Sequence, residues 1–220
     1  MPRYARVVVR HYPHHIVHKG NGGQAVFLDK SDYNKYLELL KKYSEKWRCG
    51  IQAYCLMPNH VHILIVPPDE TSLARMMHSI AFLYTQYFNR KYSAEGHLWG
   101  NRFYSSVVDA DSYHWTAALY VEQNPLRAGL VPSAEMYSYS SARAHARGKS
   151  DPVLSASLFD EFDQKEYRKA LREPLTDEQL METRTQTKLC KPLGSARFIR
   201  TVERLLGISI PRNRHSSEKR

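Results

Sequence analysis

Apolar and polar positions along the first half of the chain follow the two periods that separate strands from helices. Four short apolar or β-branched runs have the length of strands: 14–18, 51–57, 60–66 and 102–108. Two longer stretches, 32–47 and 71–92, place apolar side chains at helical spacing, and Pro58-Asn59 supplies a turn between the second and third strands. This order of elements predicts an α+β, ferredoxin-like (split βαβ) antiparallel sheet with helices on one face. The other face would then be free for a nucleic acid strand.

The pattern after the fourth strand is helical. We expect a third helix that is capped by Asp109 or Asp111 and stopped by Pro125, because proline disfavours helical backbone in the residue before it. A further helix should end the core near Arg147, ahead of a linker-like stretch at 148–152. The chain therefore divides into a core and a C-terminal extension.

The core is predicted to comprise residues 1–147, and the extension, residues 148–220, is predicted to be helical. Residues 154–173 and 176–188 have helical patterns, and the second begins with a capping-box pair of Thr and Gln. Ser195 is placed to cap a last helix at 196–206, which Gly207 ends.

Charge changes the picture of this extension. From Arg184 to the end of the sequence, ten Lys and Arg stand against two acids, which gives +8 of the net charge of +10. A basic block of this kind favours a polyanionic partner, most commonly nucleic acid. The alternative is a solubilising tail.

Composition excludes several classes of protein. No run approaches 18 apolar residues, so we expect no membrane-spanning helix. The first residues lack the apolar region of a signal peptide, and the three cysteines are too scattered for a disulfide framework or a zinc knuckle. We expect a cytoplasmic, nucleoid-associated bacterial protein with reduced cysteines.

The candidate chemistry begins with His60 and His62. On a strand, alternate side chains share a face, so both imidazoles project together while Val61 enters the core. Two neutral imidazoles side by side can bind a divalent metal. Surface histidines with no such role are the ordinary alternative, but this pair opens an otherwise apolar strand.

The third helix supplies the second part of the candidate site. Thr116, Tyr120 and Asn124 follow at intervals of four and line one polar stripe. A phenolate is a nucleophile and a bound metal is a Lewis acid, so the two parts together suit phosphoryl transfer. Asn124 offers an amide oxygen as a third ligand, with Gln123 as the alternative because Pro125 disfavours regular helix at Asn124.

These motifs resemble those of the Y1 transposases of the insertion-sequence-200 type, and more closely those of the REP-associated tyrosine transposases of the HUH endonuclease superfamily. The resemblance covers roughly residues 10 to 145 and rests on three segments in order: Leu56-Met-Pro-Asn-His-Val-His-Ile-Leu-Ile65, Trp99-Gly-Asn-Arg-Phe-Tyr104 and Tyr120-Val-Glu-Gln-Asn-Pro-Leu-Arg-Ala-Gly-Leu130. The Lys191-Pro-Leu-Gly-Ser195 stretch also resembles an element of the longer members.

The resemblance implies a transposase that cuts and rejoins single-stranded DNA beside a palindromic REP-like hairpin through a 5′-phosphotyrosine. Tyr120 would be the nucleophile, and His60 and His62 would hold Mg²⁺ or Mn²⁺ with an amide side chain. Insertion-sequence members act as dimers, whereas the REP-associated relatives resemble monomers, so a monomer is the first expectation.

Five arginines are candidate DNA contacts. Two flank the presumed site and suit bidentate phosphate contacts, and three form a basic stripe on the last predicted helix: Arg102, Arg127, Arg197, Arg200 and Arg204. A non-catalytic hairpin-DNA-binding protein is an alternative, although binding alone would need neither the histidines nor the tyrosine. An RNA-binding module is another, and it would predict exposed aromatic residues on the central strands.

Overall fold

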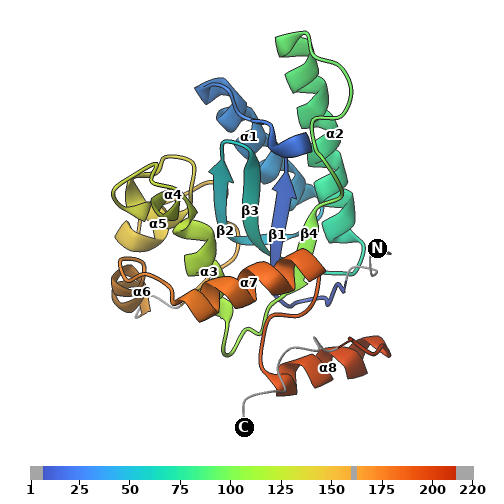
Figure 1. Ribbon diagram of the computed structural model, residues 1–220, viewed down its shortest axis with the longest axis vertical. Coiled ribbons are helices and arrows are strands. Elements are labelled where there is room, and N and C mark those ends of the chain that lie inside the picture. The colour runs from blue at the N-terminus through green and yellow to red at the C-terminus, as the bar shows by residue number, and fades with distance from the viewer. Residues whose placement is uncertain (1–6, 160–162, 212–220) are drawn as a thin grey trace.

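A four-stranded antiparallel sheet lies at the centre of the computed structural model, which describes residues 7–159 and 163–211 (Figure 1). Its strands run in the spatial order β2-β3-β1-β4. Their bounds are β1 His14–Lys19, β2 Gly50–Met57, β3 His60–Val66 and β4 Tyr104–Val107. Each pair of neighbours is antiparallel, which confirms the predicted ferredoxin-like class and all four predicted strands.

Two long helices, α1 (Lys30–Lys46) and α2 (Ser72–Tyr92), pack together on one face of the sheet, as the pattern predicts (Figure 1). The strands contribute every second side chain to this interface, and Ile16, Ile63 and Ile65 are fully buried there. Burying a side chain of this size stabilises the fold by about 1.5–3 kcal/mol. This layer is the principal hydrophobic core.

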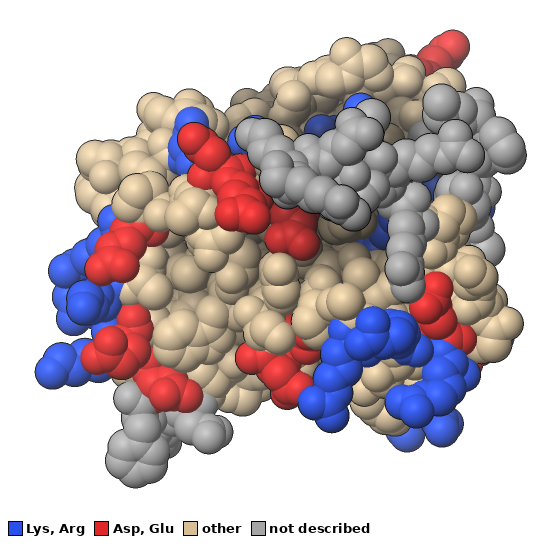
Figure 2. Space-filling view, turned by 60° about the horizontal axis from the view of Figure 1, so that its bottom comes forward, with Lys and Arg blue, Asp and Glu red and all other residues tan. Residues whose placement is uncertain are grey.

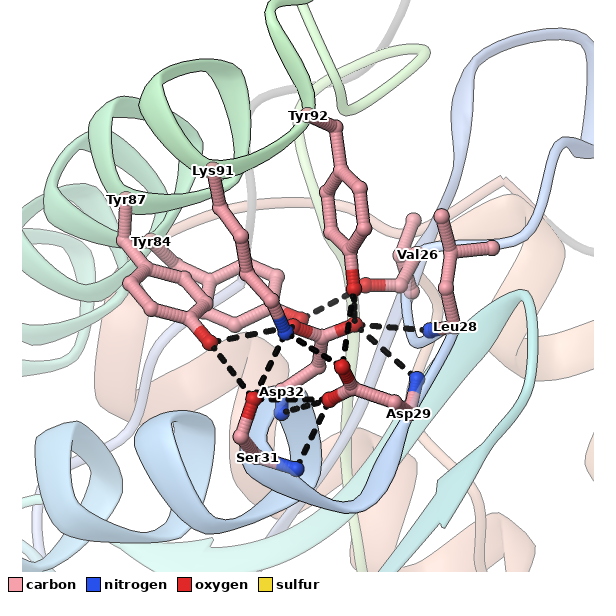
Figure 3. A network of polar contacts seen from close by, with 9 residues as sticks. All are labelled: Val26, Leu28, Asp29, Ser31, Asp32, Tyr84, Tyr87, Lys91 and Tyr92. Atoms are coloured by element: carbon pink, nitrogen blue, oxygen red, sulfur yellow. Dashed lines mark hydrogen bonds and ion pairs between the residues drawn. The ribbon is translucent and has the colours of Figure 1, made fainter.

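A network of polar contacts joins the first turn of α1 to the last turn of α2 (Figure 3). The buried carboxylate of Asp32 accepts hydrogen bonds from the Lys91 ammonium at 2.8 Å, from the hydroxyls of Tyr87 and Tyr92, and from the backbone amide of Leu28. Asp29, the N-cap of α1, forms a capping box with Asp32 and also pairs with Lys91. The charge on Asp32 is therefore compensated within the network.

The opposite face of the sheet carries helices as well, which corrects the expectation that it is free. Helix α3 (His114–Glu122) contacts β2 and β3, and α7 (Asp177–Leu189) contacts β1 and β4 (Figure 1). The capping box predicted at the start of α7 is present. Between α3 and α7, part of this face stays open as a pocket.

The third helix differs from its prediction at both ends. It begins only at His114, because the carboxylate of Asp109 binds Asp111 N, Ser112 and Ser195 in a turn instead of capping a helix. Helix α3 ends at Glu122, and Pro125 does not end the helical structure there but lies in the first turn of a second, short helix, α4 (Asn124–Arg127). Proline is tolerated there because the first turn of a helix needs no amide donor.

The predicted helix at 154–173 is largely wrong. Only α6, Gln164–Ala170, is helical, and residues 160–162 lie outside the described part. The amides of Ser155 and Ala156 instead donate to the carbonyl of Ile51, and Gln52 donates to Ser157 O at 2.8 Å. The backbone groups of this segment form hydrogen bonds with the edge strand β2 and are therefore not available for the hydrogen bonds of a helix.

The remaining elements match the predicted core end and last helix. Helix α5, Ala142–Arg147, ends at Gly148, whose φ is 63°, and α8, Ala196–Leu206, is capped by Ser195 and ends at Gly207. Two short 3₁₀ turns complete the fold: η1 Asn21–Gly23 and η2 Ala134–Met136. Within the described residues, no helix is long and apolar enough to span a membrane.

A segment of the extension pairs with the edge of β4. Leu193 forms a parallel bridge with Val108, and its amide donates to Val107 O at 2.8 Å. Gly194 makes this approach possible, because a Cβ there would lie 2.5 Å from Cβ of Asp109. The extension is thus packed on the sheet rather than set apart from it.

Candidate active site

A pocket of about 440 Å³ opens between the sheet, α3 and α7. Its lining residues come from three strands, from α3 with α4, and from α7: His15, Val17, Lys19, His60, His62, Tyr104, Tyr120, Asn124, Arg184, Thr187 and Lys188. It therefore brings together the two histidines, the tyrosine and the amide that the sequence nominates.

His60 and His62 lie at the start of β3 with ring centroids 4.9 Å apart. The Nδ1 of His60 is 2.6 Å from Oδ1 of Asn59, and the Nδ1 of His62 is 2.9 Å from Nε2 of His15. Each ring is therefore held through Nδ1, and among the described residues no hydrogen bond to either Nε2 is found. This leaves one nitrogen of each ring for a ligand.

Both imidazoles are neutral at ordinary pH. Burial, and to a lesser degree the Lys19 ammonium, lowers the pKa of His60 to about 4. Burial and the neighbouring His15 and His60 imidazoles hold the pKa of His62 well below its usual value. A neutral imidazole keeps a lone pair, which is the form that binds a metal.

Tyr120 lies in the last turns of α3 with its ring against the histidines. The ring is 6% exposed, and its centroid is 5.4 Å from that of His15 and 5.7 Å from that of His62. No hydrogen bond to the phenol hydroxyl is found within residues 7–159 and 163–211. The hydroxyl is thus available for chemistry in the pocket.

A buried carboxylate two residues further on anchors this helix. Glu122 is fully buried and accepts hydrogen bonds from Ser141, His145 and Tyr167, the last at 2.9 Å. These partners come from α5, α6 and the residue before α5. Glu122 therefore fixes the end of α3, and with it the position of Tyr120.

Arg127 lies beneath Tyr120 rather than on the surface. Its guanidinium is 4.6 Å from the centroid of the Tyr120 ring, and its Nη2 donates to the Tyr120 carbonyl at 2.6 Å. Burial lowers the pKa of Arg127 to about 10, so the group stays cationic at neutral pH. A cation over the ring face is attracted to the ring, so Arg127 holds the Tyr120 ring as well as its carbonyl. This placement suits support of the tyrosine better than the phosphate contact that the sequence suggested.

The two candidates for the amide ligand have different surroundings. The Nδ2 of Asn124 donates to the Tyr120 carbonyl at 2.7 Å, and Asn124 lines the pocket. The Nε2 of Gln123 donates to carbonyls of Leu171 and Glu173, and its side chain does not line the pocket. Of the two, Asn124 is the one that shares the pocket with the histidines.

Among the described residues, three cations and no acid line the pocket. Lys19 comes from β1, and Arg184 and Lys188 project from α7, one turn apart and exposed. The sequence places Arg184 and Lys188 in the basic block of the extension but does not indicate that they line this pocket, and it does not nominate Lys19, His15 or Thr187. Only the i, i+4 spacing of Arg184 and Lys188 was visible, since the docking of α7 on this face is a tertiary event.

The remaining candidate arginines lie elsewhere. Arg102 lines a separate cavity of about 420 Å³ with His18, Trp99 and Phe103. Arg197, Arg200 and Arg204 are all exposed on α8, opposite the buried Phe198 and Val202. On the side of the molecule that carries α8, basic side chains gather in separate clusters with acidic side chains between them (Figure 2). The basic residues that the sequence places at 212–220 lie outside the described residues.

The donor set was tested for its fit to a metal. Among the described residues, no group of three or more His, Cys, Asp or Glu side chains is arranged to hold an ion. The set at hand is instead two imidazole nitrogens and one amide oxygen, each held by a hydrogen bond through its other polar atom. Such a set suits a divalent ion with open positions for phosphate oxygens and water.

Comparison with known proteins agrees with the motifs. Residues 8–124, more than half of the chain, match the model of a family described as IS200-like transposases. A Haemophilus influenzae protein described as a REP-associated tyrosine transposase is 26% identical over 124 residues, which are 50% of this chain and 69% of the relative. A solved structure of a REP-associated tyrosine transposase bound to a REP hairpin has a TM-score of 0.56 at 16% identity, and the match covers 80% of this chain and 100% of the other.

Proposed function

Because the chain belongs to the IS200-like transposase family, we propose that it is a metal-dependent endonuclease and strand transferase of the HUH type that cuts single-stranded DNA beside hairpin-forming palindromes. The observation that carries this proposal is the shared pocket of His60, His62, Asn124 and Tyr120. The related solved structure holds a REP hairpin, and a hairpin of that kind is the substrate class that we propose here.

Tyr120 is the proposed nucleophile. Its phenol oxygen attacks a DNA phosphorus, a bond forms between them, and the bond from phosphorus to the 3′-oxygen breaks. The phenol proton leaves to solvent and the 3′-oxygen takes up a proton, which gives a 5′-phosphotyrosine and a free 3′-OH. Since one phosphodiester replaces another, a 3′-OH can reverse the step and no external energy source is needed. Arg127 packs on the Tyr120 ring and donates to the Tyr120 carbonyl, so it positions the nucleophile.

His60, His62 and Asn124 would hold Mg²⁺ or Mn²⁺ in the pocket. When bound, the ion would polarise the scissile phosphate and orient it for in-line attack. The neutral state of both imidazoles suits this role, because no proton must be displaced at pH 7.

The cations at the pocket rim are the proposed contacts for the DNA backbone. Lys19, Arg184 and Lys188 lie around the tyrosine with no acid among them, so they attract phosphates on either side of the cleaved bond. The exposed stripe of Arg197, Arg200 and Arg204 is the proposed contact for the hairpin stem.

Replacing Arg184 or Lys188 by Ala should lower DNA affinity and reduce the salt dependence of binding by about one ion each. Lys42→Ala on α1 is the matched control, and equal losses would count against the rim.

One assay tests the proposal. Labelled hairpin oligonucleotides, DNA and RNA, are incubated with the protein with and without Mn²⁺ or Mg²⁺ and run on a denaturing protein gel. We expect a covalent adduct with DNA that requires the ion and is absent from Tyr120→Phe, which should still bind the hairpin. Tight binding without an adduct would favour a hairpin-binding protein, and an RNA preference would favour an RNA-binding module.

Tyr104→Phe is the sharpest control, because Tyr104 is the second tyrosine of the same pocket. It should keep the adduct that Tyr120→Phe loses. The reverse pattern would assign the nucleophile to Tyr104 and overturn the role of Tyr120.

A further inference from the structure

His15 is a fully buried histidine on β1 that the proposed chemistry does not use. Its Nε2 is 2.9 Å from Nδ1 of His62, and its Nδ1 is 2.9 Å from Oγ1 of Thr187 on α7. The rings of His15 and His62 are nearly parallel, at 10° with centroids 5.2 Å apart. A chain of hydrogen bonds thus runs from His62, across β1, to the C-terminal extension.

The contact between two neutral rings requires one N–H and one lone pair. In the first arrangement, His62 donates from Nδ1 to His15, and His15 donates from Nδ1 to the Thr187 oxygen. In the second, His15 donates from Nε2 to His62, and the Thr187 hydroxyl donates to His15. The first leaves the His62 Nε2 with a lone pair toward the pocket, whereas the second places an N–H there.

We propose that His15 and Thr187 are positioning residues that hold His62 in the first arrangement, with its Nε2 lone pair facing the pocket. The inference rests on the proposed function, because only a metal-binding His62 needs that lone pair. Thr187 makes the arrangement possible by accepting the Nδ1–H of His15. Without that acceptor, a buried N–H would be orphaned, and an orphaned N–H is rarer in proteins than an unpaired acceptor.

The tautomer of His60 is fixed in a similar way, but by a neighbour in the sequence. Its Nδ1 lies against Oδ1 of Asn59, whose Nδ2 donates to Gly23 O, so the amide can only accept from the ring. The tautomer of His60 is therefore set by its chain neighbour. The tautomer of His62 depends on a residue 125 positions away along the chain, in the helix that the extension adds.

The substitution Thr187→Val tests the inference, because it removes the hydroxyl and keeps the shape. Mn²⁺ affinity of the full chain, measured by calorimetry without DNA, should fall about 10- to 100-fold, which is the usual effect of an outer-shell partner. Thr187→Ser should retain the affinity. Thr183→Val is a matched control, one turn earlier on α7, since the Thr183 hydroxyl is buried and no partner for it is found among the described residues.

A second readout separates this inference from the proposed function. In metal-free protein, long-range ¹H–¹⁵N spectra report which nitrogen of His62 carries the proton. We expect Nδ1 in the wild type and in Thr183→Val, and Nε2 in Thr187→Val. The same tautomer in all three, or equal Mn²⁺ affinity of the two valine variants, would overturn the inference. A wild type that binds no Mn²⁺ would overturn the proposed metal site, while the spectra would still decide the role of Thr187.

Discussion

Two polar clusters, one on each side of the sheet, differ in how completely their hydrogen-bonding groups are paired. The network around Asp32 joins α1 to α2, and every polar group in it faces another group of the network or the backbone (Figure 3). The cluster of His15, His60, His62 and Tyr120 is held together just as closely, yet its outermost atoms face a pocket.

The difference separates stability from chemistry. A buried polar group without a partner costs free energy, so a group of several such atoms around one pocket calls for an explanation. In the Asp32 network, Lys91 and the tyrosine hydroxyls saturate the carboxylate, and the arrangement serves the fold. In the histidine cluster, two ring nitrogens and a phenol have no hydrogen-bond partner within residues 7–159 and 163–211, and this arrangement suits the function that we propose.

The largest expected effect is on the open cluster. His60→Ala should lower the rate of adduct formation about 10³-fold, or about 4 kcal/mol of transition-state stabilisation. The free energy of unfolding of this variant should change by about 1 kcal/mol or less, because only the partly buried hydrogen bond to Asn59 is lost. His78→Ala, an exposed histidine on α2, should change neither quantity. Rapid cleavage by His60→Ala would break the contrast between the clusters.

The closed network should show the reverse pattern. Asp32→Asn leaves Lys91 without its buried partner, so we expect a loss of about 3 kcal/mol in the free energy of unfolding. Adduct formation at a temperature where the variant is folded should be unchanged. Urea unfolding measures the first and the gel assay the second. Glu38→Gln, in the surface pair with Lys35, should cost at most about 0.5 kcal/mol.

Arg127 tests whether the open cluster depends on a supporting cation. Arg127→Met should slow adduct formation about tenfold at saturating DNA, with little change in DNA affinity, because Tyr120 loses the cation that holds its ring and carbonyl in place. Arg127→Lys should not restore the rate, since lysine lacks the planar fork that also holds the Tyr120 carbonyl. Arg102→Met should show the opposite pattern, weaker binding at an unchanged rate.

The smallest expected effect is on stability in acid, where the buried histidines should take up protons before the carboxylates. Burial lowers the pKa of His14 to about 4 and that of His15 to about 3, so the unfolded chain takes up protons first. Stability is fully present above pH 6.5 and falls as pH drops toward 4, by at most about 1.4 kcal/mol per unit for each imidazole.

The carboxylates follow at lower pH. Burial opposes ionisation of Asp32, but Lys91 and the other donors outweigh it and hold its pKa below the usual 3.8. The stability that this network contributes is therefore present above pH 3.8 and is lost only below it. Urea midpoints from pH 7.5 to 3 should show two steps, with His14→Gln flattening the first and Asp32→Asn the second. A single step below pH 4 would contradict the buried neutral histidines.

The sequence predicts what depends on local period and spacing. The alternation along 60–66 placed His60 and His62 on one face, and the four-residue interval brought Asn124 to the same pocket as Tyr120. It could not predict that His15 would meet His62, because this needs the register between β1 and β3. Nor could it predict that the amides of Ser155 and Ala156 both donate to Ile51 O of β2, where a tertiary partner competes with a helical pattern.

The position of α7 in the sequence also determines when the pocket becomes complete during synthesis of the chain. Ribosomes make the chain from its N-terminus, at about 5–20 residues per second, so β1, β3 and α3 emerge well before α7. Thr187, Arg184 and Lys188 complete the wall of the pocket, and His15 lies 172 residues before Thr187. A nascent chain therefore cannot present the full pocket before α7 has been made.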